Sequence, residues 1–118
     1  MELKELVLNG SAGRSDILIG RGLLDVAAER CLSVFAPNRV HIVTDSNVAP
    51  LYLQRLKNEF TLPVSITVLP AGEEHKRLSA VEGIYHDLLE AGMTRKDLVI
   101  ALGGGVVGDI TGFAAATY

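Results

Sequence analysis

The most constraining feature of this 118-residue chain is an apolar run that ends in three consecutive glycines. Leu98–Leu102 shows no alternation of apolar and polar residues, which predicts a strand buried on both faces, as in a parallel sheet. The glycines at 103–105 follow, and the segment Val106–Thr117 is compatible with a helix. Glycines at such a turn leave backbone N–H groups uncovered at the positive end of the helix dipole. The pattern therefore predicts a phosphate-binding turn of the kind that holds a dinucleotide.

Composition limits the classes of protein to which this chain can belong. It is 48% hydrophobic and has only 4 prolines, which indicates one globular core. A formal charge of −3 provides no basic face, so we expect no binding of nucleic acid. No apolar run approaches the ~20 residues that span a bilayer, and the N-terminus lacks the order of a signal peptide. We therefore expect no membrane association and a cytoplasmic location.

Histidine and cysteine are too few and too scattered to form a metal site. Cys31 is the only cysteine, which excludes an internal disulfide and a cysteine-based zinc cage, and we expect a buried thiol. The three histidines lack the spacing of metal ligands. His41 is expected in or beside the sheet and His86 on an exposed helix face, whereas His75 lies in a loop.

Short apolar runs alternate with helical patterns, which predicts an α/β fold with a Rossmann-like, mostly parallel sheet flanked by helices. Turn residues between two short strands at about 5–8 and 16–19 predict an N-terminal β-hairpin. Three later strands, each leading into a loop and a helix, are expected at 40–44, 64–69 and 98–102. Helices are expected at about 23–33, 47–59, 79–91 and 106–117, with Gly92 ending the third in the left-handed conformation.

The loops after the three parallel strands carry the unusual polar residues of this chain. In open parallel sheets, ligands bind beyond the carboxyl ends of the strands, so the three loops are expected to form one site. Its candidate residues are Asp45 and Asn47 in the first loop, Glu73, Glu74, His75 and Lys76 in the second, and the glycines with Asp109 in the third.

Each of these features also has a structural interpretation, and the pattern leaves both open. The run 103–108 satisfies G-x-G-x-x-G, but glycine turns also serve plain strand–helix connections. Asp45 can accept hydrogen bonds from ribose hydroxyls or cap the following helix. Asp109 likewise can bind a ligand hydroxyl or cap a helix. The charged loop 73–76 can be a solvated turn, or its Lys76 can neutralise phosphate.

Three segments together resemble the 3-dehydroquinate synthase family. They are VTDSNV at 43–48, PAGEEHK at 70–76, and GGGVVGD at 103–109, the last continuing through GFAAATY at 112–118. The segment DILIGRGLL at 16–24 is similar to the second strand of that family. The resemblance covers the whole chain in order, and the glycine-rich motif is its most specific part.

The resemblance implies that residues 1–118 form a single, truncated NAD-binding domain. Enzymes of the family use NAD as a recycled catalyst together with a divalent metal, zinc or cobalt. They convert 3-deoxy-D-arabino-heptulosonate 7-phosphate into 3-dehydroquinate and phosphate in the shikimate pathway, which leads to chorismate and the aromatic amino acids. Their C-terminal helical domain carries the metal and substrate ligands, and we expect it to be absent from this chain.

The same resemblance implies which partners to expect. They are NAD and, in a full-length enzyme, the sugar-phosphate substrate and a second copy in a homodimer. This piece alone is expected to have no synthase activity. Two alternatives stay open: a related sugar-phosphate cyclase or polyol dehydrogenase, and a stand-alone nucleotide-binding module without catalysis.

Matched position by position, the resemblance also implies roles for individual residues. Asp45 would bind the adenosine ribose with Asn47 close by, and residues 71–76 would line the adenosine side, chiefly through Glu73 and Lys76. Backbone N–H groups at 104–106 would hold the pyrophosphate, and Asp109 would reach the nicotinamide ribose. The complete implied set of cofactor-binding residues is Asp45, Asn47, Ala71, Gly72, Glu73, Glu74, His75, Lys76, Gly104, Gly105, Val106, Val107, Gly108 and Asp109.

Overall fold

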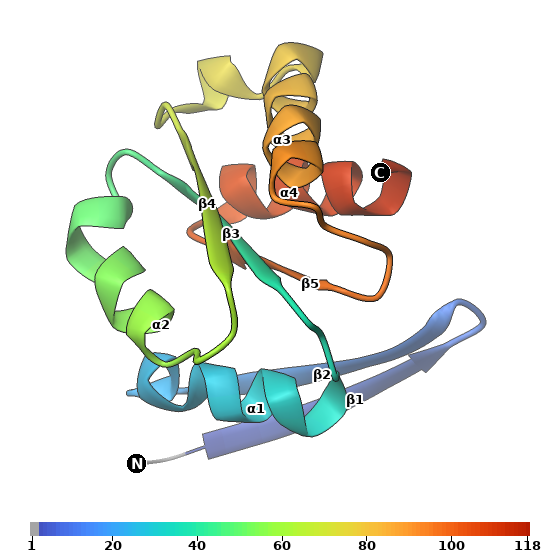
Figure 1. The fold of residues 1–118 in the computed structure, drawn as a ribbon. Coiled ribbons are helices and arrows are strands. Elements are labelled where there is room, and N and C mark those ends of the chain that lie inside the picture. The colour runs from blue at the N-terminus through green and yellow to red at the C-terminus, as the bar shows by residue number, and fades with distance from the viewer. Residues whose placement is uncertain (1–2) are drawn as a thin grey trace.

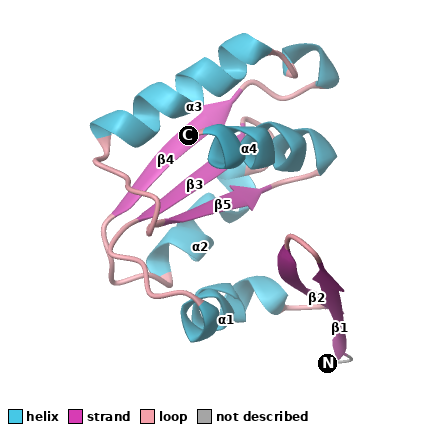
Figure 2. Cartoon of the chain, turned by 90° about the vertical axis from the view of Figure 1, so that its right-hand side faces the viewer, coloured by secondary structure: helices cyan, strands magenta, loops and turns pink. Residues whose placement is uncertain are grey.

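The computed structural model describes residues 3–118, so Met1 and Glu2 of the predicted domain lie outside the described residues. Three parallel strands form its central sheet in the order β4-β3-β5. They are β3 (Val40–Asp45), β4 (Val64–Leu69) and β5 (Leu98–Leu102). Helices cover both faces of this sheet (Figures 1 and 2). The predicted α/β fold with a parallel sheet flanked by helices is confirmed.

The predicted N-terminal hairpin is also present. Strands β1 (Leu3–Gly10) and β2 (Gly13–Gly20) pair antiparallel around a two-residue turn, and both are longer than the sequence pattern predicts. The hairpin is separate from the three-stranded sheet and lies beside α1 (Ala27–Val34) (Figure 1). An ion pair of 2.8 Å between Arg30 and Glu5 connects α1 to the hairpin.

The predicted helices occur, but two of them are divided. The first begins as a 3-10 turn, η1 (Leu23–Val26), before α1; the second begins as a π turn, η2 (Ala49–Leu53), before α2 (Gln54–Asn58). A 3-10 turn, η3 (Glu73–His75), interrupts the loop after β4 and precedes α3 (Leu78–Glu90). The last helix is α4 (Gly105–Thr117).

Gly92 ends α3 as predicted, with a left-handed φ of 69°. The N–H of Met93 donates to the carbonyl of Leu88 at 3.0 Å, and the N–H of Gly92 donates to that of Leu89 at 3.1 Å. These two bonds define a Schellman motif, which satisfies carbonyls that the end of the helix would otherwise leave free.

Two apolar clusters pack on opposite faces of the sheet. α3 and α4 cover one face, with a core of Val43, Leu69, Val81, Ile84, Leu88, Met93, Val107, Ile110 and Ala114. α1 and α2 cover the other, with a core of Ala28, Val40, Ile42, Leu56 and Phe60. Figure 2 shows the two pairs of helices on either side of the strands.

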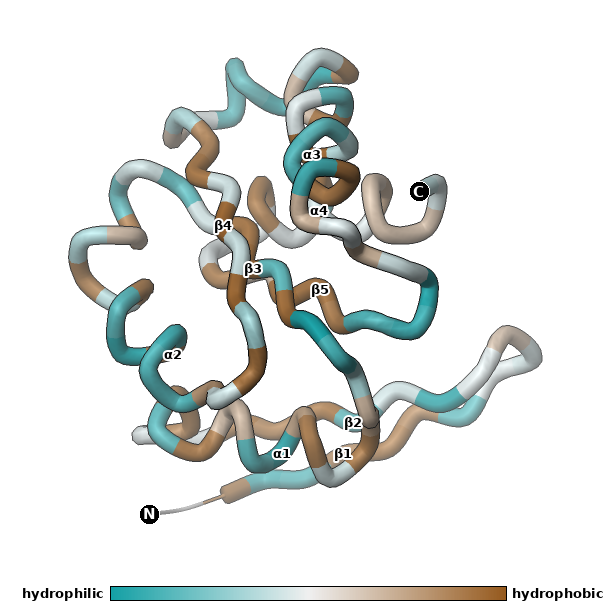
Figure 3. Tube along the Cα trace, in the orientation of Figure 1, coloured by the Kyte–Doolittle hydropathy of each residue, from teal (hydrophilic) through white to brown (hydrophobic). Residues whose placement is uncertain are grey.

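The prediction that β5 is buried on both faces is wrong for this chain. Its residues are only half-buried and Ala101 is exposed, because β5 forms an edge of the three-stranded sheet. The strand buried on both faces is β3, which lies in the centre and whose residues 40–44 are all buried. The apolar character of a strand does not by itself show whether the strand is central or at an edge. Figure 3 shows a hydrophobic run along the edge strand β5, with hydrophilic residues in the loop before it.

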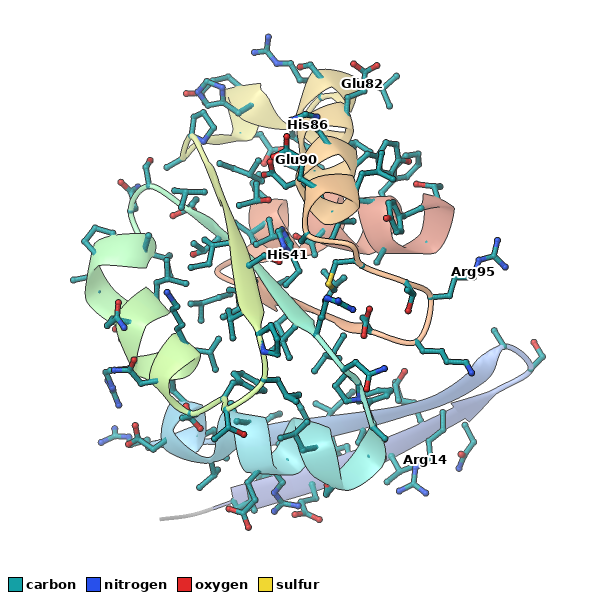
Figure 4. All side chains as sticks on the ribbon, in the orientation of Figure 1. Arg14, His41, Glu82, His86, Glu90 and Arg95 are labelled. Carbon is teal, nitrogen blue, oxygen red and sulfur yellow. The ribbon has the colours of Figure 1, made fainter. Side chains whose placement is uncertain are left out.

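The isolated histidines and the cysteine lie in three different environments. His41 is completely buried within β3, and His86 lies on the exposed face of α3, both as predicted (Figure 4). Cys31 is half-buried rather than buried, because α1 lies at the margin of the core and buries only Ala28 fully. Burial, and secondarily the charge of Glu59, raises the pKa of the Cys31 thiol.

Asp97 connects two loops at the amino end of the sheet. Its Oδ1 accepts hydrogen bonds from the backbone N–H groups of Asn38, at 3.1 Å, and Arg39, at 3.0 Å. Its Oδ2 accepts the N–H of Thr94 at 2.8 Å. Burial alone would raise the pKa of Asp97, but these bonds outweigh it and lower the pKa. The carboxylate therefore acts as a clamp that sets where β3 and β5 begin.

We expect Asp97→Asn to lower the free energy of unfolding by about 1 kcal/mol, because the amide can replace only one of the two acceptor oxygens. Urea titrations followed by circular dichroism measure this change. Asp25→Asn is the matched control, since within residues 3–118 the Asp25 carboxylate makes only an exposed ion pair of 2.6 Å with Arg55. Equal losses in the two variants would contradict the clamp.

Candidate functional site at the carboxyl edge of the sheet

The three loops predicted to share a site meet at the carboxyl edge of the sheet. Thr44 pairs in register with Leu102, and Asp45 with Leu69, so the three strands end together. The N–H of Ala71 donates to Ser46 Oγ at 3.0 Å, which joins the loop after β3 to the loop after β4. An ion pair between Lys76 and Asp109 joins the second loop to α4.

The glycines of the turn after β5 have two different roles. A Cβ on Gly103 would lie 2.9 Å from Val107 Cγ2, so only glycine allows α4 to pack this closely on the turn. A Cβ on Gly104 or Gly105 would meet nothing within 4 Å. Gly103 is therefore required by the packing of the fold, whereas Gly104 and Gly105 border open space.

Among residues 3–118, no side chain caps the first N–H groups of α4, which lie beside this open space. The N-cap residue Gly104 has an extended backbone and no side-chain cap. The first helical N–H groups have no carbonyl partner within a helix, which leaves those of Gly105, Val106 and Val107 free to bind an anion. The N–H of Gly108 differs, because it donates to the Gly104 carbonyl at 3.0 Å.

The predicted residues of this motif thus contribute unequally. The Val107 side chain is buried in the core, so only its backbone faces the turn. Gly108 uses its N–H within the helix, and a ligand can reach only its bare Cα, which has open space around it. Gly105 and Val106 offer the amides best placed for a phosphate.

Asp45 performs a structural role in the loop after β3. Its Oδ1 accepts the backbone N–H groups of Asn47, at 2.9 Å, and Val48, at 2.8 Å. Both bonds use Oδ1, so within residues 3–118 its second oxygen, Oδ2, remains to accept from a ligand. Asp45 thus holds the turn before η2 rather than its N-cap, which is Val48 and has no side-chain cap. Binding of a ribose stays a prediction.

Much of the charged loop after β4 is committed to local contacts. Gly72 has a φ of +123°, and a Cβ there would lie 2.5 Å from Glu74 Oε1, so the Glu74 carboxylate folds back on the chain. The Glu74 carbonyl accepts two hydrogen bonds from Arg77, at 2.6 and 3.2 Å. His75 lies 3.8 Å from the Glu74 carboxylate. For Ala71, Gly72, Glu74 and His75, contact with a cofactor stays a prediction.

Lys76 lies beside Asp109. Its Nζ donates to Asp109 Oδ2 at 2.7 Å and lies 3.7 Å from Glu73 Oε1. The hydrogen bond and the charge of Asp109, with a smaller contribution from Glu73, raise the pKa of Lys76. The resemblance assigns Lys76 to the adenosine side and Asp109 to the other ribose, whereas here the two side chains are in direct contact.

Two hollows lie close to the glycine turn, and no sequence pattern described above predicts either of them. One, of about 360 Å³, is lined by Leu24, Val48, Tyr52, Leu102 and Gly103. The other, of about 310 Å³, lies between the start of α3 and α4 and is lined by Lys76, Leu78, Val81, Asp109, Ile110 and Phe113, among others. The four-residue spacing of Gly105, Asp109 and Phe113 was the available signal, since it places all three on one face of α4.

Within the described residues 3–118, no group of three or more His, Cys, Asp or Glu side chains is arranged to hold a metal ion. The same part of the chain contains no helix with the length and apolarity needed to cross a membrane.

Comparison with known proteins identifies the relatives of this chain. Residues 66–118 match the family model described as 3-dehydroquinate synthase N-terminal. The chain is 37% identical to the 3-dehydroquinate synthase of Clostridium kluyveri and 40% identical to that of Blochmanniella floridana, in each case over 98% of its length. Its identity to the enzyme of Streptococcus pneumoniae is 42% over 87% of its length. The resemblance to the 3-dehydroquinate synthase family is confirmed.

The chain spans about a third of the length of these curated 3-dehydroquinate synthases, covering 33% of the first two and 30% of the third. Solved structures show the same fold. A 2-deoxy-scyllo-inosose synthase is 24% identical with a TM-score of 0.79, covering 98% of this chain and 32% of that one. A 2-deoxy-scyllo-inosose synthase solved with carbaglucose-6-phosphate, NAD+ and Co2+ has a TM-score of 0.75 at 21% identity, covering 99% and 32%.

Proposed function

We propose that residues 1–118 are the NAD-binding part of a 3-dehydroquinate synthase, the enzyme that converts 3-deoxy-D-arabino-heptulosonate 7-phosphate into 3-dehydroquinate and phosphate. The observation that carries the proposal is the row of uncapped amides at the start of α4, where Gly104 and Gly105 leave open space. The names of the relatives and the NAD+ complex of the structural neighbour support it.

The surroundings of the turn match the parts of a dinucleotide. A diphosphate carries negative charge, which the N-terminus of a 13-residue helix stabilises. In such a cofactor, one ribose and one ring lie on each side of the diphosphate. Near the glycine turn, one hollow includes Gly103 in its lining and the other includes Asp109, while Asp45 ends the neighbouring strand β3.

We therefore place the diphosphate on the amides of Gly105 and Val106, and the adenosine ribose on Oδ2 of Asp45. Asp109 would accept a hydrogen bond from the second ribose. The bound cofactor would supply a hydride acceptor for a temporary oxidation of the substrate. The task of this chain is to hold and orient it.

The described residues do not fit the metal that the family uses, since none of their His, Cys, Asp and Glu side chains form a suitable group. We assign no step through zinc or cobalt here, and place the metal and sugar-phosphate ligands in the part of the relatives that this chain does not span. A homodimer, a cytoplasmic location and a place in aromatic amino acid biosynthesis belong to the same proposal for the full-length enzyme.

Isothermal titration calorimetry with NAD+, ADP-ribose and ATP tests the proposal. We expect NAD+ and ADP-ribose to bind more tightly than ATP, because both place two riboses around one diphosphate. A preference for ATP would contradict the proposal and favour a general nucleotide-binding module. We expect no turnover of the sugar phosphate by this chain alone, and steady turnover would contradict the division of roles given above.

Substitution of Asp45 tests the ribose contact. We expect Asp45→Ala to weaken NAD+ binding by about 10-fold, the loss of one charge-assisted hydrogen bond, and to leave inorganic pyrophosphate binding within about 2-fold. Asp45→Asn is the matched control, since its amide oxygen can still accept from Asn47 and Val48. Loss of pyrophosphate binding in Asp45→Ala but not in Asp45→Asn would mean that Asp45 acts on the loop rather than on the ribose.

A further inference from the structure

The ion pair between Lys76 and Asp109 bridges the two walls of the hollow between α3 and α4. Lys76, Leu78 and Val81 line it from the segment that leads into α3, while Asp109, Ile110 and Phe113 line it from α4. Lys76 and Asp109 are 2.7 Å apart, and both side chains are partly exposed. The pair therefore spans the rim of a mainly apolar hollow that is open to solvent.

The pair also lies next to the open glycine turn. Asp109 is four residues after Gly105, so it occupies the same face of α4 one turn further along. Lys76 ends the η3 turn, where its N–H donates to the Glu73 carbonyl at 3.0 Å. Its ammonium lies between two carboxylates, those of Asp109 and Glu73.

We propose that the Lys76–Asp109 pair is a latch that an anion at the glycine turn opens by taking Lys76 away from Asp109. This inference rests on the proposed function and concerns regulation of the same site. Opening the latch removes the ion pair that spans the rim, so binding at the turn widens the entry to the hollow for the ring of the same ligand. Phosphate at the turn and a ring in the hollow then bind cooperatively.

The balance of interactions favours such an exchange. An exposed ion pair contributes little to stability, since water and salt screen it, so separating it costs little. A diphosphate at the end of α4 carries more negative charge than a single carboxylate, and the helix dipole holds it in place. Asp109 opposes binding in two ways: it occupies Lys76, and it repels the incoming anion.

Inorganic pyrophosphate is the decisive probe, because it has no ribose to contact Asp109. We expect Asp109→Asn to tighten pyrophosphate binding by about 3- to 10-fold, and Lys76→Met to weaken it by a similar factor, as measured by calorimetry. Asp16→Asn is the matched control: it removes the same charge and breaks a pair of 2.8 Å with Arg14 on the hairpin, away from the glycine turn (Figure 4). We expect less than about 2-fold change there.

A second measurement needs no ligand. Asp109 raises the pKa of Lys76, so this pKa should fall in Asp109→Asn. NMR of 13Cε-labelled lysine measures it. An unchanged Lys76 pKa would overturn the latch, as would unchanged or weaker pyrophosphate binding in Asp109→Asn. If the unsubstituted chain binds neither pyrophosphate nor NAD+, the phosphate site itself is wrong and the latch falls with it. If it binds both and Asp109→Asn changes nothing, only the latch is wrong.

Discussion

Replacing Gly105 with alanine should weaken binding of NAD+ and pyrophosphate by about 30-fold or more, while the fold remains intact. A Cβ at this position meets no protein atom within 4 Å, so it fills only the space above the amides. In a helix the Cβ tilts toward the N-terminus, which directs it at the bound phosphate. Moving a diphosphate off the amides costs about 2 kcal/mol or more, comparable to overpacking in a core.

The stability of the Gly105→Ala variant should be equal or slightly higher, by about 0.5 kcal/mol, because alanine loses less backbone entropy on folding. Gly103→Ala is the matched control with the opposite result. Its Cβ would press on the stiff, buried Val107, and we expect a loss of about 1–3 kcal/mol in the free energy of unfolding. Urea titration and calorimetry on both variants measure the two effects. Loss of stability without loss of binding in Gly105→Ala would contradict the assigned roles.

Acidification from pH 7 to pH 5 should destabilise the fold through His41. This imidazole is fully buried, with Nδ1 2.6 Å from Ser65 Oγ and Nε2 2.8 Å from Thr67 Oγ1. The Thr67 hydroxyl donates to Asp87 Oδ2 at 2.5 Å, so in the neutral ring Nε2 donates to Thr67 and Ser65 donates to Nδ1. Figure 4 shows His41 within the strands, beneath α3.

Burial lowers the pKa of His41, and the charge of Asp87 only partly opposes this shift. As the pH falls below the ordinary histidine pKa of about 6.5, His41 becomes protonated in the unfolded chain but stays neutral in the folded chain. Stability therefore falls by up to about 1.4 kcal/mol per pH unit, until the lower pKa of the folded state is reached. Above about pH 7 both states are neutral, and His41 contributes no pH dependence.

Urea titrations between pH 5 and pH 7.5 measure this slope. His41→Gln should reduce it, whereas the matched control His86→Gln should not, because the His86 side chain is 69% exposed. Because His41→Gln also disturbs the buried bonds to Ser65 and Thr67 at every pH, the slope and not the absolute value is the test. An unchanged slope in His41→Gln would contradict the role of His41.

The order of elements and the edge that carries the site could be predicted from the sequence, because both follow from local patterns. β-Branched runs, the turn residues of the hairpin and the glycine after α3 each determine structure within a few residues. The burial of β5 and of Cys31 could not be predicted in this way. Burial depends on strand order and on the size of the assembled layers, which no local pattern records.

Some features of the candidate site also follow from local sequence patterns, whereas others depend on tertiary contacts. The uncapped amides and the role of Gly105 follow from glycines placed between a strand and a helix. The Lys76–Asp109 pair and the two hollows do not, because each joins segments that are distant in the sequence; the two residues of the pair are 33 positions apart. Gly103 shows the limit most clearly, because the three consecutive glycines look equivalent in the sequence. Only the contact with Val107 shows that packing requires Gly103, whereas the other two glycines border open space.

A titration of the 15N-labelled chain with NAD+, followed by two-dimensional NMR, tests the central claim most directly. The diphosphate should shift the backbone amide signals of Gly105 and Val106 most, with a smaller shift for Gly108, whose N–H is already bonded to Gly104. Inorganic pyrophosphate should reproduce this part of the response. If the largest shifts instead fall on the hairpin or the far end of α4, or if the signals of Gly105 and Val106 do not move, the cofactor does not bind at this turn.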